Sequence, residues 1–268
     1  PWCAVARAVH PRLANAVVTH ARGVAGAVGR RLRHQHRHVA ARGALRAMPG
    51  LVSVFTTEQA YPTVAAQLAQ PMVHPWTPTV TLPKNCSAIV FGPGLAGADV
   101  PEAMRGELFR YWCESPLPVI ADASGLAWLP RGAVADGALR VITPHPGEAA
   151  ALLDCATADV QANRLGALRE LASVHGACVV LKGRHTLVGS VDGEVFLNSS
   201  GNPQLAQGGS GDVLAGYLGG WLAQPRLHTD ADRVIRHAVW AHGAAADALA
   251  ARGRAWTMAD LIEELGAA

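Results

Sequence analysis

A glycine-rich loop followed at once by an acidic residue is the part of this sequence that most directly allows chemistry. Gly208-Gly209-Ser210-Gly211-Asp212 runs straight into an apolar helical pattern. Glycine lets the backbone approach a ligand closely, and the first N–H groups of a helix point outward at the positive end of its dipole. Such a site binds phosphate and stabilises charge that develops during group transfer. Asp212 could accept a proton there, although a purely structural turn would also fit this loop taken alone.

Four short apolar runs end in residues that can bind a ligand or carry a proton. The strands predicted at 88–91, 118–121, 140–143 and 178–181 lead into residues 92–95 (GPGL), Asp122, residues 144–148 (PHPGE) and Lys182-Gly183. Because the carboxyl ends of parallel strands meet at one rim of a sheet, we expect these residues to lie near one another. Asp122 fits either a substrate-side carboxylate or the N-cap of a following helix, and we favour the cap.

Strands alternate with helices along the chain, which predicts βαβ units and a mostly parallel sheet in an α/β fold. A further strand is expected at 51–56, and a hairpin about Asp192-Gly193 joins 186–190 to 194–198. Residues 71–83 suit a proline-rich connection. In the last long helix, His242 and Asp247 are expected to be packing and surface residues. Helices are expected at 58–70, 101–114, 149–153, 159–175, 212–224, 230–251 and 257–265.

The composition is that of a folded domain in a reducing compartment. A chain of 268 residues can bury a sizeable core, and no apolar run approaches the length of about 18 residues that spans a bilayer. The five cysteines are scattered without CxxC spacing, which argues against disulfides and against a zinc site. We therefore expect a cytoplasmic protein with no membrane partner.

The N-terminal part differs in charge from the rest. Residues 1–57 carry nine arginines and no acidic residue, whereas the remainder holds 14 basic and 20 acidic residues. The densest stretch, 30–38, could contact nucleic acid, belong to a transit peptide, or reflect an atypical N-terminus such as a shifted reading frame gives. No aromatic residue interleaves these arginines, which weakens the nucleic-acid interpretation. We favour an atypical segment over residues 1–42, followed by one domain over 43–268.

In combination, four segments resemble the NAD(P)H-hydrate dehydratases, a branch of the ribokinase-like fold: residues 92–95, 142–153, 179–188 and 201–216. The resemblance extends from about Gly43 to the C-terminus, with supporting matches at 121–126 and 238–250. It implies a three-layer α/β/α sandwich with a mostly parallel central sheet. It also implies a lyase that uses ADP or ATP, with Mg²⁺, to dehydrate the S-epimer of hydrated NADH or NADPH in a metabolite-repair reaction.

The same resemblance implies roles for individual residues. Asp212 would be the base that deprotonates the substrate hydroxyl, and the N–H groups of Gly209, Ser210 and Gly211 would form the anion hole. Glu148 stands where related kinases order magnesium-bound water, while the metal ligands themselves are not assigned. Arg184 and His185 occupy variable positions, whose side chains equally suit solvent. Nucleotide binding falls to Lys182, Gly183, Arg184, His185, Thr186 and Gly211, and substrate binding to Gly94, His145 and Asp212.

The chain departs from the family at its front. Family members begin with a KGxxGH-type segment, a first strand and a small-residue helix against the substrate. Here Arg30 to His38 takes that place, so we expect a disrupted first strand and a clash near Gln35–His36. Two further hypotheses therefore stay open. The chain could be a catalytically impaired remnant that only binds nucleotide, or the basic stretch could contact nucleic acid. The nearest alternative enzyme is a vitamin-precursor kinase of the same superfamily. The sequence HPGE at residues 145–148 argues against that alternative.

The resemblance also bears on partners. It implies a homo-oligomer, a tetramer in similar enzymes, and an epimerase partner or a fused epimerase domain. The expected ligands are hydrated NADH or NADPH and the nucleotide ADP or ATP. No nucleic acid is expected as a ligand.

Overall fold

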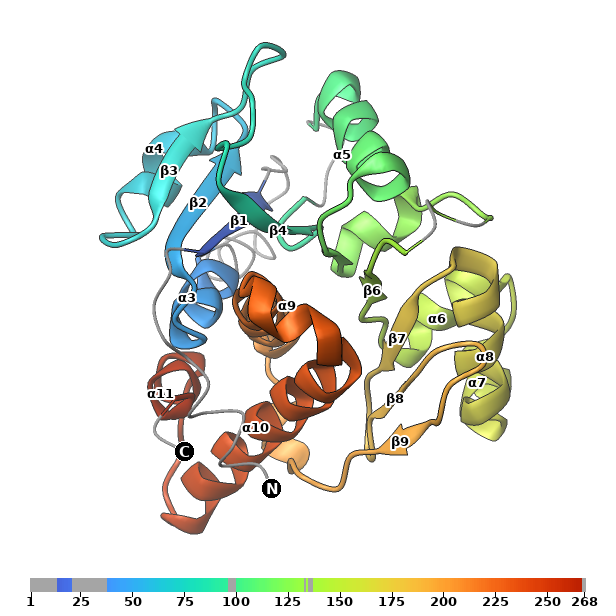
Figure 1. Cartoon of the computed structure of the whole chain (residues 1–268). Helices are drawn as coiled ribbons and strands as arrows, with labels where there is room; N and C mark the ends of the chain where they lie inside the picture. Colours follow the sequence, from blue (N-terminus) through green and yellow to red (C-terminus); the bar gives the residue numbers. More distant parts are fainter. Residues whose placement is uncertain (1–13, 21–37, 96–99, 133, 135–136, 267–268) are drawn as a thin grey trace, which may run out of the picture.

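The computed structural model describes residues 14–20, 38–95, 100–132, 134 and 137–266. Within these residues one sheet runs through the molecule with the strand order β3-β2-β1-β4-β5-β6-β7-β8-β9 (Figure 1). Neighbouring strands from β3 to β7 pair in parallel, and β8 and β9 add an antiparallel edge. The strands are β1 Ala14–His20, β2 Gly50–Thr56, β3 Met72–Pro75, β4 Cys86–Phe91, β5 Val119–Ala121, β6 Arg140–Ile142, β7 Cys178–Leu181, β8 Leu187–Gly189 and β9 Phe196–Leu197.

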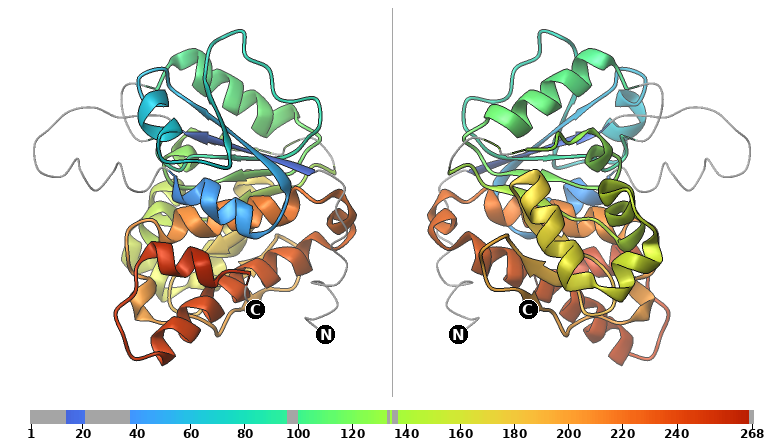
Figure 2. Two further views of the ribbon diagram at one scale, coloured as in Figure 1. Left: turned by 90° about the vertical axis from the view of Figure 1, so that its left-hand side faces the viewer. Right: turned by 90° about the vertical axis from the view of Figure 1, so that its right-hand side faces the viewer.

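Helices cover both faces of the sheet, which confirms the predicted three-layer sandwich (Figure 2). One core cluster joins the sheet to α3 (Val39–Arg46), α9 (Ser210–Leu222), α10 (Ala231–Ala251) and α11 (Met258–Glu264). The other joins it to α5 (Glu102–Glu114), α6 (Pro146–Leu153), α7 (Thr157–Ala162) and α8 (Arg164–His175). Successive residues of a strand point to opposite faces, so Ile89 and Phe91 enter the second cluster while Val90 enters the first. In the described part of the chain, no helix is long and apolar enough to cross a membrane.

The N-terminal segment supplies a central strand, contrary to the sequence-based expectation. β1 pairs in parallel with β2 from Ala14↔Gly50 to His20↔Thr56, and with β4 on its other side. The prediction of a disrupted first strand was therefore wrong. The β-branched pair Val17-Val18 marked this strand, but it lies among alanines and arginines that dilute the pattern. Residues 30–37, with Gln35–His36, lie outside the described residues, and the division at residue 43 stays a prediction.

Most predicted elements are confirmed, with three differences. The helix expected at 159–175 divides at Asn163, whose side chain accepts a hydrogen bond from the Gly166 N–H at 2.9 Å and caps α8. The helix expected at 58–70 shortens to α4, Tyr61–Ala65. The proline-rich connection at 71–83 contains the edge strand β3, which ends at Pro75, a residue that cannot donate to a further ladder bond.

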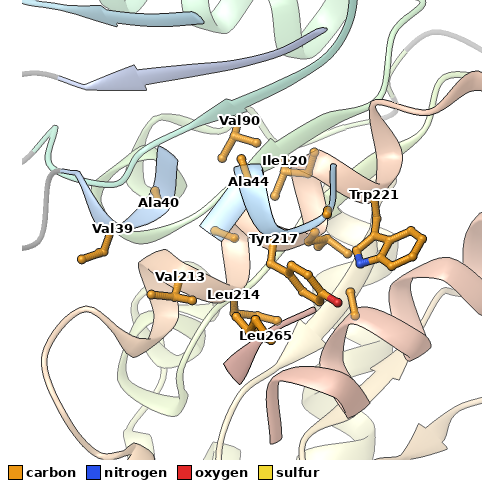
Figure 3. Close-up of a cluster of buried hydrophobic side chains, with 14 of the residues drawn as sticks. Val39, Ala40, Ala44, Val90, Ile120, Val213, Leu214, Tyr217, Trp221 and Leu265 are labelled. Carbon is orange, nitrogen blue, oxygen red and sulfur yellow. The ribbon is translucent and has the colours of Figure 1, made fainter. Parts of the chain in front are cut away.

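The helices α3 and α9 pack backbone against backbone beneath the sheet (Figure 3). A Cβ atom added at Gly43, Gly216 or Gly220 would lie 2.5, 1.8 or 2.4 Å from a carbonyl oxygen of the facing helix. Around this contact the larger side chains of α9 fill the core, with the rings of Tyr217 and Trp221 edge to face at 6.1 Å. Because neither helix has room to shift, the start of α9 is held in a fixed place.

Candidate active site

The glycine loop enters α9 through a left-handed residue. Gly209 is the N-cap, with a φ of 95° that an L side chain rarely adopts, and the helix begins at Ser210. The Ser210 N–H is bonded to the Gln207 carbonyl at 3.3 Å within the turn. Of the three N–H groups predicted to form an anion hole, that of Ser210 is thus already engaged. Those of Gly209 and Gly211 are the better candidates for a ligand.

Asp122, which is buried, forms an ion pair with the partly buried Lys182 at the ends of β5 and β7. The Lys182 Nζ lies 2.8 Å from Oδ1 of Asp122, and the Thr143 hydroxyl donates to the same oxygen at 2.6 Å. The Asp122 side chain is only 1 % exposed, so its charge depends on these partners. Asp122 does precede a 3₁₀ turn, Ala123–Trp128, but its side chain makes no capping hydrogen bond. Our preference for a cap was therefore wrong.

The ion pair reaches the glycine loop. A Cβ atom added at Gly211 would lie 3.1 Å from the Lys182 Nζ and 3.9 Å from Oδ2 of Asp122. Glu148, at the start of α6, stands 3.8 Å from the same ammonium group. The ends of β5 and β7 and the starts of α6 and α9 therefore meet, as expected of strand ends in a parallel sheet.

This cluster gives Asp212 an unusual pKa. Burial raises the pKa of Asp212 to about 8, the carboxylate of Asp122 adds to the rise, Lys182 opposes it, and Glu148 contributes a further increase. Burial alone would lower the pKa of Lys182, but Asp122 and Glu148 raise it above its ordinary value, so the ammonium stays charged. A carboxylate with a pKa near neutrality is suited to general base catalysis.

His145 and Glu148 cap α6 reciprocally. The His145 Nδ1 accepts hydrogen bonds from the N–H groups of Gly147 and Glu148 at 3.0 and 3.2 Å, and Glu148 Oε2 accepts from the His145 N–H at 2.8 Å. The His145 ring is 57 % exposed. The capping role explains why these residues stand in this order, and the exposed ring leaves His145 accessible at the rim.

The loop after β7 turns sharply at two residues with positive φ, Gly183 at 137° and His185 at 56°. The Thr186 hydroxyl donates to the Gly183 carbonyl at 3.1 Å and closes the turn. The side chains of Arg184 and His185 are exposed, in agreement with the solvent-facing interpretation of these variable positions.

The loop after β4 lies against the segment that follows β5. A Cβ atom at Gly92, whose φ is 116°, would lie 1.7 Å from the Asp122 carbonyl oxygen. Gly94, two residues further on, also has a positive φ of 73°. The contact brings the predicted substrate-contacting loop beside the backbone of Asp122.

Two residues that position this site were missed in the sequence. Thr143, which binds Asp122, is the polar residue that ends the run RVIT, so its place at a strand end was a usable signal. Arg164, from α8, donates to the carbonyls of Leu181 and Lys182 at 3.0 and 3.4 Å and supports the strand end before the 182–186 loop. No local pattern distinguishes Arg164 from a surface arginine.

His242 and Asp247, predicted to be packing and surface residues, bond to the segment that leads into the glycine loop. The buried His242 places Nε2 3.1 Å from the Ser210 carbonyl oxygen. Asp247 accepts from the Gly201 N–H at 2.8 Å and from the Asn202 side chain at 2.9 Å. The apolar helical pattern around them concealed these contacts, which join residues more than 30 positions apart.

Comparison with known proteins gives a consistent family match. A family model described as NAD(P)H-hydrate dehydratase matches residues 37–266. An ADP-dependent (S)-NAD(P)H-hydrate dehydratase of Neisseria meningitidis is 45% identical over 172 residues, 62% of this chain and 56% of the relative. The bifunctional NAD(P)H-hydrate repair enzyme Nnr of Gloeobacter violaceus is 40% identical over 225 residues, 78% of this chain and 42% of the relative. The chain thus spans about half the length of the curated relatives it matches.

A solved structure extends the comparison to nearly the whole chain. An ADP/ATP-dependent NAD(P)H-hydrate dehydratase from Bacillus subtilis, co-crystallized with ATP/Mg²⁺, superposes with a TM-score of 0.80 at 26% identity. The match covers 99% of this chain and 95% of that one. The ribokinase-like fold expected from the sequence is therefore confirmed.

Proposed function

We propose the function of this chain from the premise that it belongs to the NAD(P)H-hydrate dehydratase family, whose model matches residues 37–266. The proposed reaction is the ADP- or ATP-dependent dehydration of the S-epimer of hydrated NADH or NADPH back to the reduced cofactor. One observation carries the proposal: Asp212, at the start of α9, lies beside the Lys182–Asp122 ion pair, with its pKa raised to about 8. This position and this pKa are those expected of a general base next to an anion-binding loop.

In the proposed reaction Asp212 takes the proton of the substrate hydroxyl. The freed oxygen attacks the terminal phosphorus of the nucleotide, a new O–P bond forms, and the bond from phosphorus to the bridging oxygen breaks. Hydroxide is a poor leaving group, whereas the resulting phosphate is a good one. Its departure breaks the ring C–O bond, and loss of a proton from the neighbouring carbon restores the double bond. A positioned base of this kind contributes on the order of a hundred- to ten-thousand-fold.

The negative charge that develops on the transferred phosphate faces two positive groups. The start of α9 presents the Gly209 and Gly211 N–H groups at the positive end of the helix dipole. The Lys182 ammonium, held by Asp122 2.8 Å away, lies against Gly211. Because both groups are in place before substrate binds, they stabilise the transition state without reorganisation.

The remaining assignments are proposals of the same kind. We assign nucleotide contacts to the turn Lys182–Thr186, which has exposed side chains at its tip and is supported beneath by Arg164. We assign substrate contacts to Gly94 and His145, which lie on loops at the rim around Asp122 and Glu148. In this proposal the two ligands meet at Asp212.

The residues at the rim fit Mg²⁺ that arrives with nucleotide phosphates. Among the described residues, no group of three or more His, Cys, Asp or Glu could hold a metal ion by itself. Mg²⁺ is usually bound by one or two carboxylates together with substrate phosphates, and Glu148 offers such oxygens here, while Asp212 is kept for the proton. The ion would neutralise phosphate charge when bound.

The test is recovery of reduced nicotinamide from its hydrate. The chain is incubated with hydrated NADH, Mg²⁺ and either ADP or ATP, and the near-ultraviolet absorbance of NADH is followed. We expect recovery with at least one nucleotide, its loss in Asp212→Asn, and strong impairment in Lys182→Gln. Lys84→Gln is the matched control, since Lys84 is the other lysine of the chain and is exposed. Nucleotide binding without recovery in the wild type would refute the dehydratase and favour a nucleotide-binding remnant.

The setting of the enzyme is a further proposal. We infer a cytoplasmic homo-tetramer that acts with an epimerase. The epimerase is inferred because a relative that is 40% identical is named a bifunctional repair enzyme and the chain covers 42% of it. Cys86, Cys113, Cys155 and Cys178 are free, which suits a reducing compartment. Light scattering of the purified chain tests the tetramer, and a monomer would refute it.

A further inference from the structure

The carbonyl of Ser210 and the N–H of Gly211 belong to one peptide group. A trans peptide is planar, and its C=O and N–H point in opposite directions. Because Ser210 is the first residue of α9, the helix already turns its carbonyl along the axis, and any further bond to the Ser210 oxygen restrains the direction of the Gly211 N–H as well. That N–H belongs to the first turn of α9, next to the Lys182 ammonium.

His242 of α10 binds that oxygen. Its Nε2 lies 3.1 Å from the Ser210 oxygen, and its side chain is buried. A carbonyl oxygen only accepts, so Nε2 carries the proton. Burial lowers the pKa of His242 to about 4, the Ser210 bond opposes this, and Lys182 adds to it. The ring is therefore a neutral donor at physiological pH, with its N–H committed to the glycine loop.

The same helix holds the segment that leads into the glycine loop. Asp247 accepts from the Gly201 N–H at 2.8 Å and from the Asn202 side chain at 2.9 Å. Between these two anchors Gly243 lies directly on the chain, because a Cβ atom there would be 2.3 Å from the Ser200 Oγ. α10 thus contacts the 200–210 segment at both ends, and His242 is the anchor nearest the proposed anion hole.

We propose that His242 is a positioning residue that aims the Gly211 N–H into the anion hole through its hydrogen bond to the Ser210 carbonyl. The bond adds a lateral restraint to a peptide that the first turn of α9 already orients and, by polarising its C=O, strengthens the N–H as a donor. The inference rests on the proposed function for its kinetic test, but the anion hole can also be tested without turnover.

Four variants separate positioning from packing. His242→Gln keeps an N–H able to reach the Ser210 oxygen, whereas the shorter His242→Asn does not, and His242→Leu removes the donor at similar volume. His237→Leu is the matched control, since His237 is also buried on α10 but packs on Trp221 and Trp240. For each variant we would measure kcat and KM for hydrated NADH, the melting temperature, and the affinity for inorganic pyrophosphate by calorimetry.

We expect kcat to fall roughly ten- to hundredfold in His242→Leu and His242→Asn, less than the loss of a whole oxyanion-hole donor. The KM for hydrated NADH should change little, pyrophosphate should bind more weakly, and His242→Gln should recover most of both. His237→Leu should lower the melting temperature with kcat near that of the wild type.

Equal impairment of His242→Gln and His242→Asn, or wild-type kcat in His242→Leu, would overturn the proposal. If the wild type shows no dehydration, the dehydratase proposal fails and the pyrophosphate affinities alone decide this one. Wild-type affinity in His242→Asn, or no pyrophosphate binding by the wild type, would then overturn it.

Discussion

The raised pKa of Asp212 predicts a specific pH dependence of catalysis. With a pKa of about 8, about one tenth of the Asp212 carboxyls are ionised at about pH 7 and about nine tenths at about pH 9. A general base must be ionised to act, so kcat/KM for hydrated NADH, at saturating nucleotide and Mg²⁺, should rise about tenfold over this interval.

The substitution Asp122→Asn tests the cause of that dependence. After burial, the Asp122 carboxylate contributes most to the raised pKa of Asp212, while Lys182 opposes it and Glu148 adds to it. Replacing this carboxylate with a neutral amide removes the repulsion and leaves an oxygen that can still accept from Lys182 and Thr143. The apparent pKa should therefore fall, and the ratio of kcat/KM at about pH 9 to that at about pH 7 should drop from about tenfold toward one.

The control for this experiment is Thr143→Val. It removes the 2.6 Å hydrogen bond to Asp122 but leaves the charge, so its pH profile should stay closer to that of the wild type. The assay is absorbance recovery across a buffer series of constant ionic strength. A flat wild-type profile, or an upward shift in Asp122→Asn, would refute the assignment of the titrating group to Asp212.

Three further predictions concern stability. Asp212→Asn should raise the free energy of unfolding by up to a few kcal/mol at about pH 7. The reason is that the folded-state pKa of Asp212, about 8, exceeds the ordinary 3.8, so at about pH 7 folding of the wild type requires the uptake of a proton. The gain should vanish below about pH 4, where the carboxyl is protonated in both states, as denaturant titrations at about pH 7 and about pH 4 would show. Gly216→Ala should cost about 3 kcal/mol or more, since its Cβ would lie 1.8 Å from a carbonyl oxygen, whereas Gly106→Ala, with nothing within 4 Å, should be neutral or stabilising in the same melts. Lys182→Met should cost about 3–5 kcal/mol by leaving Asp122 buried without its cation, and the double variant with Asp122→Asn should recover much of it; additive losses would argue against the pair.

The chemistry-bearing strand ends were the most predictable part of this protein. Short apolar runs that end in Asp122, His145 and Lys182 indicated a parallel sheet with one reactive rim, because strand direction alone brings such ends together. The pairing of Lys182 with Asp122 was not predictable. The sequence places them 60 positions apart, and a carboxylate before a helical turn is locally indistinguishable from a cap.

Two other misses have a common physical cause. β1 was overlooked because its sequence carries only a weak strand pattern. Its structure is decided by backbone pairing with a neighbouring strand on each side, which the local sequence does not reveal. His242 was taken for a packing residue because a histidine within an apolar helical pattern looks the same in the sequence whether it only packs or also hydrogen-bonds to a distant loop. In both cases a long-range contact overrides the local signal.

The tight packing of α9 has a consequence for hydrogen exchange. Every residue from Val213 to Leu222 is buried, and α3 lies against its backbone without room for a Cβ atom. The amides of that stretch should therefore exchange only when the whole domain unfolds. The Gly209 and Gly211 amides, at the open end of the same helix, need no unfolding to meet solvent. A bound anion should slow their exchange while leaving the rest of the helix as slow as before, so exchange would report occupancy of the site at single amides.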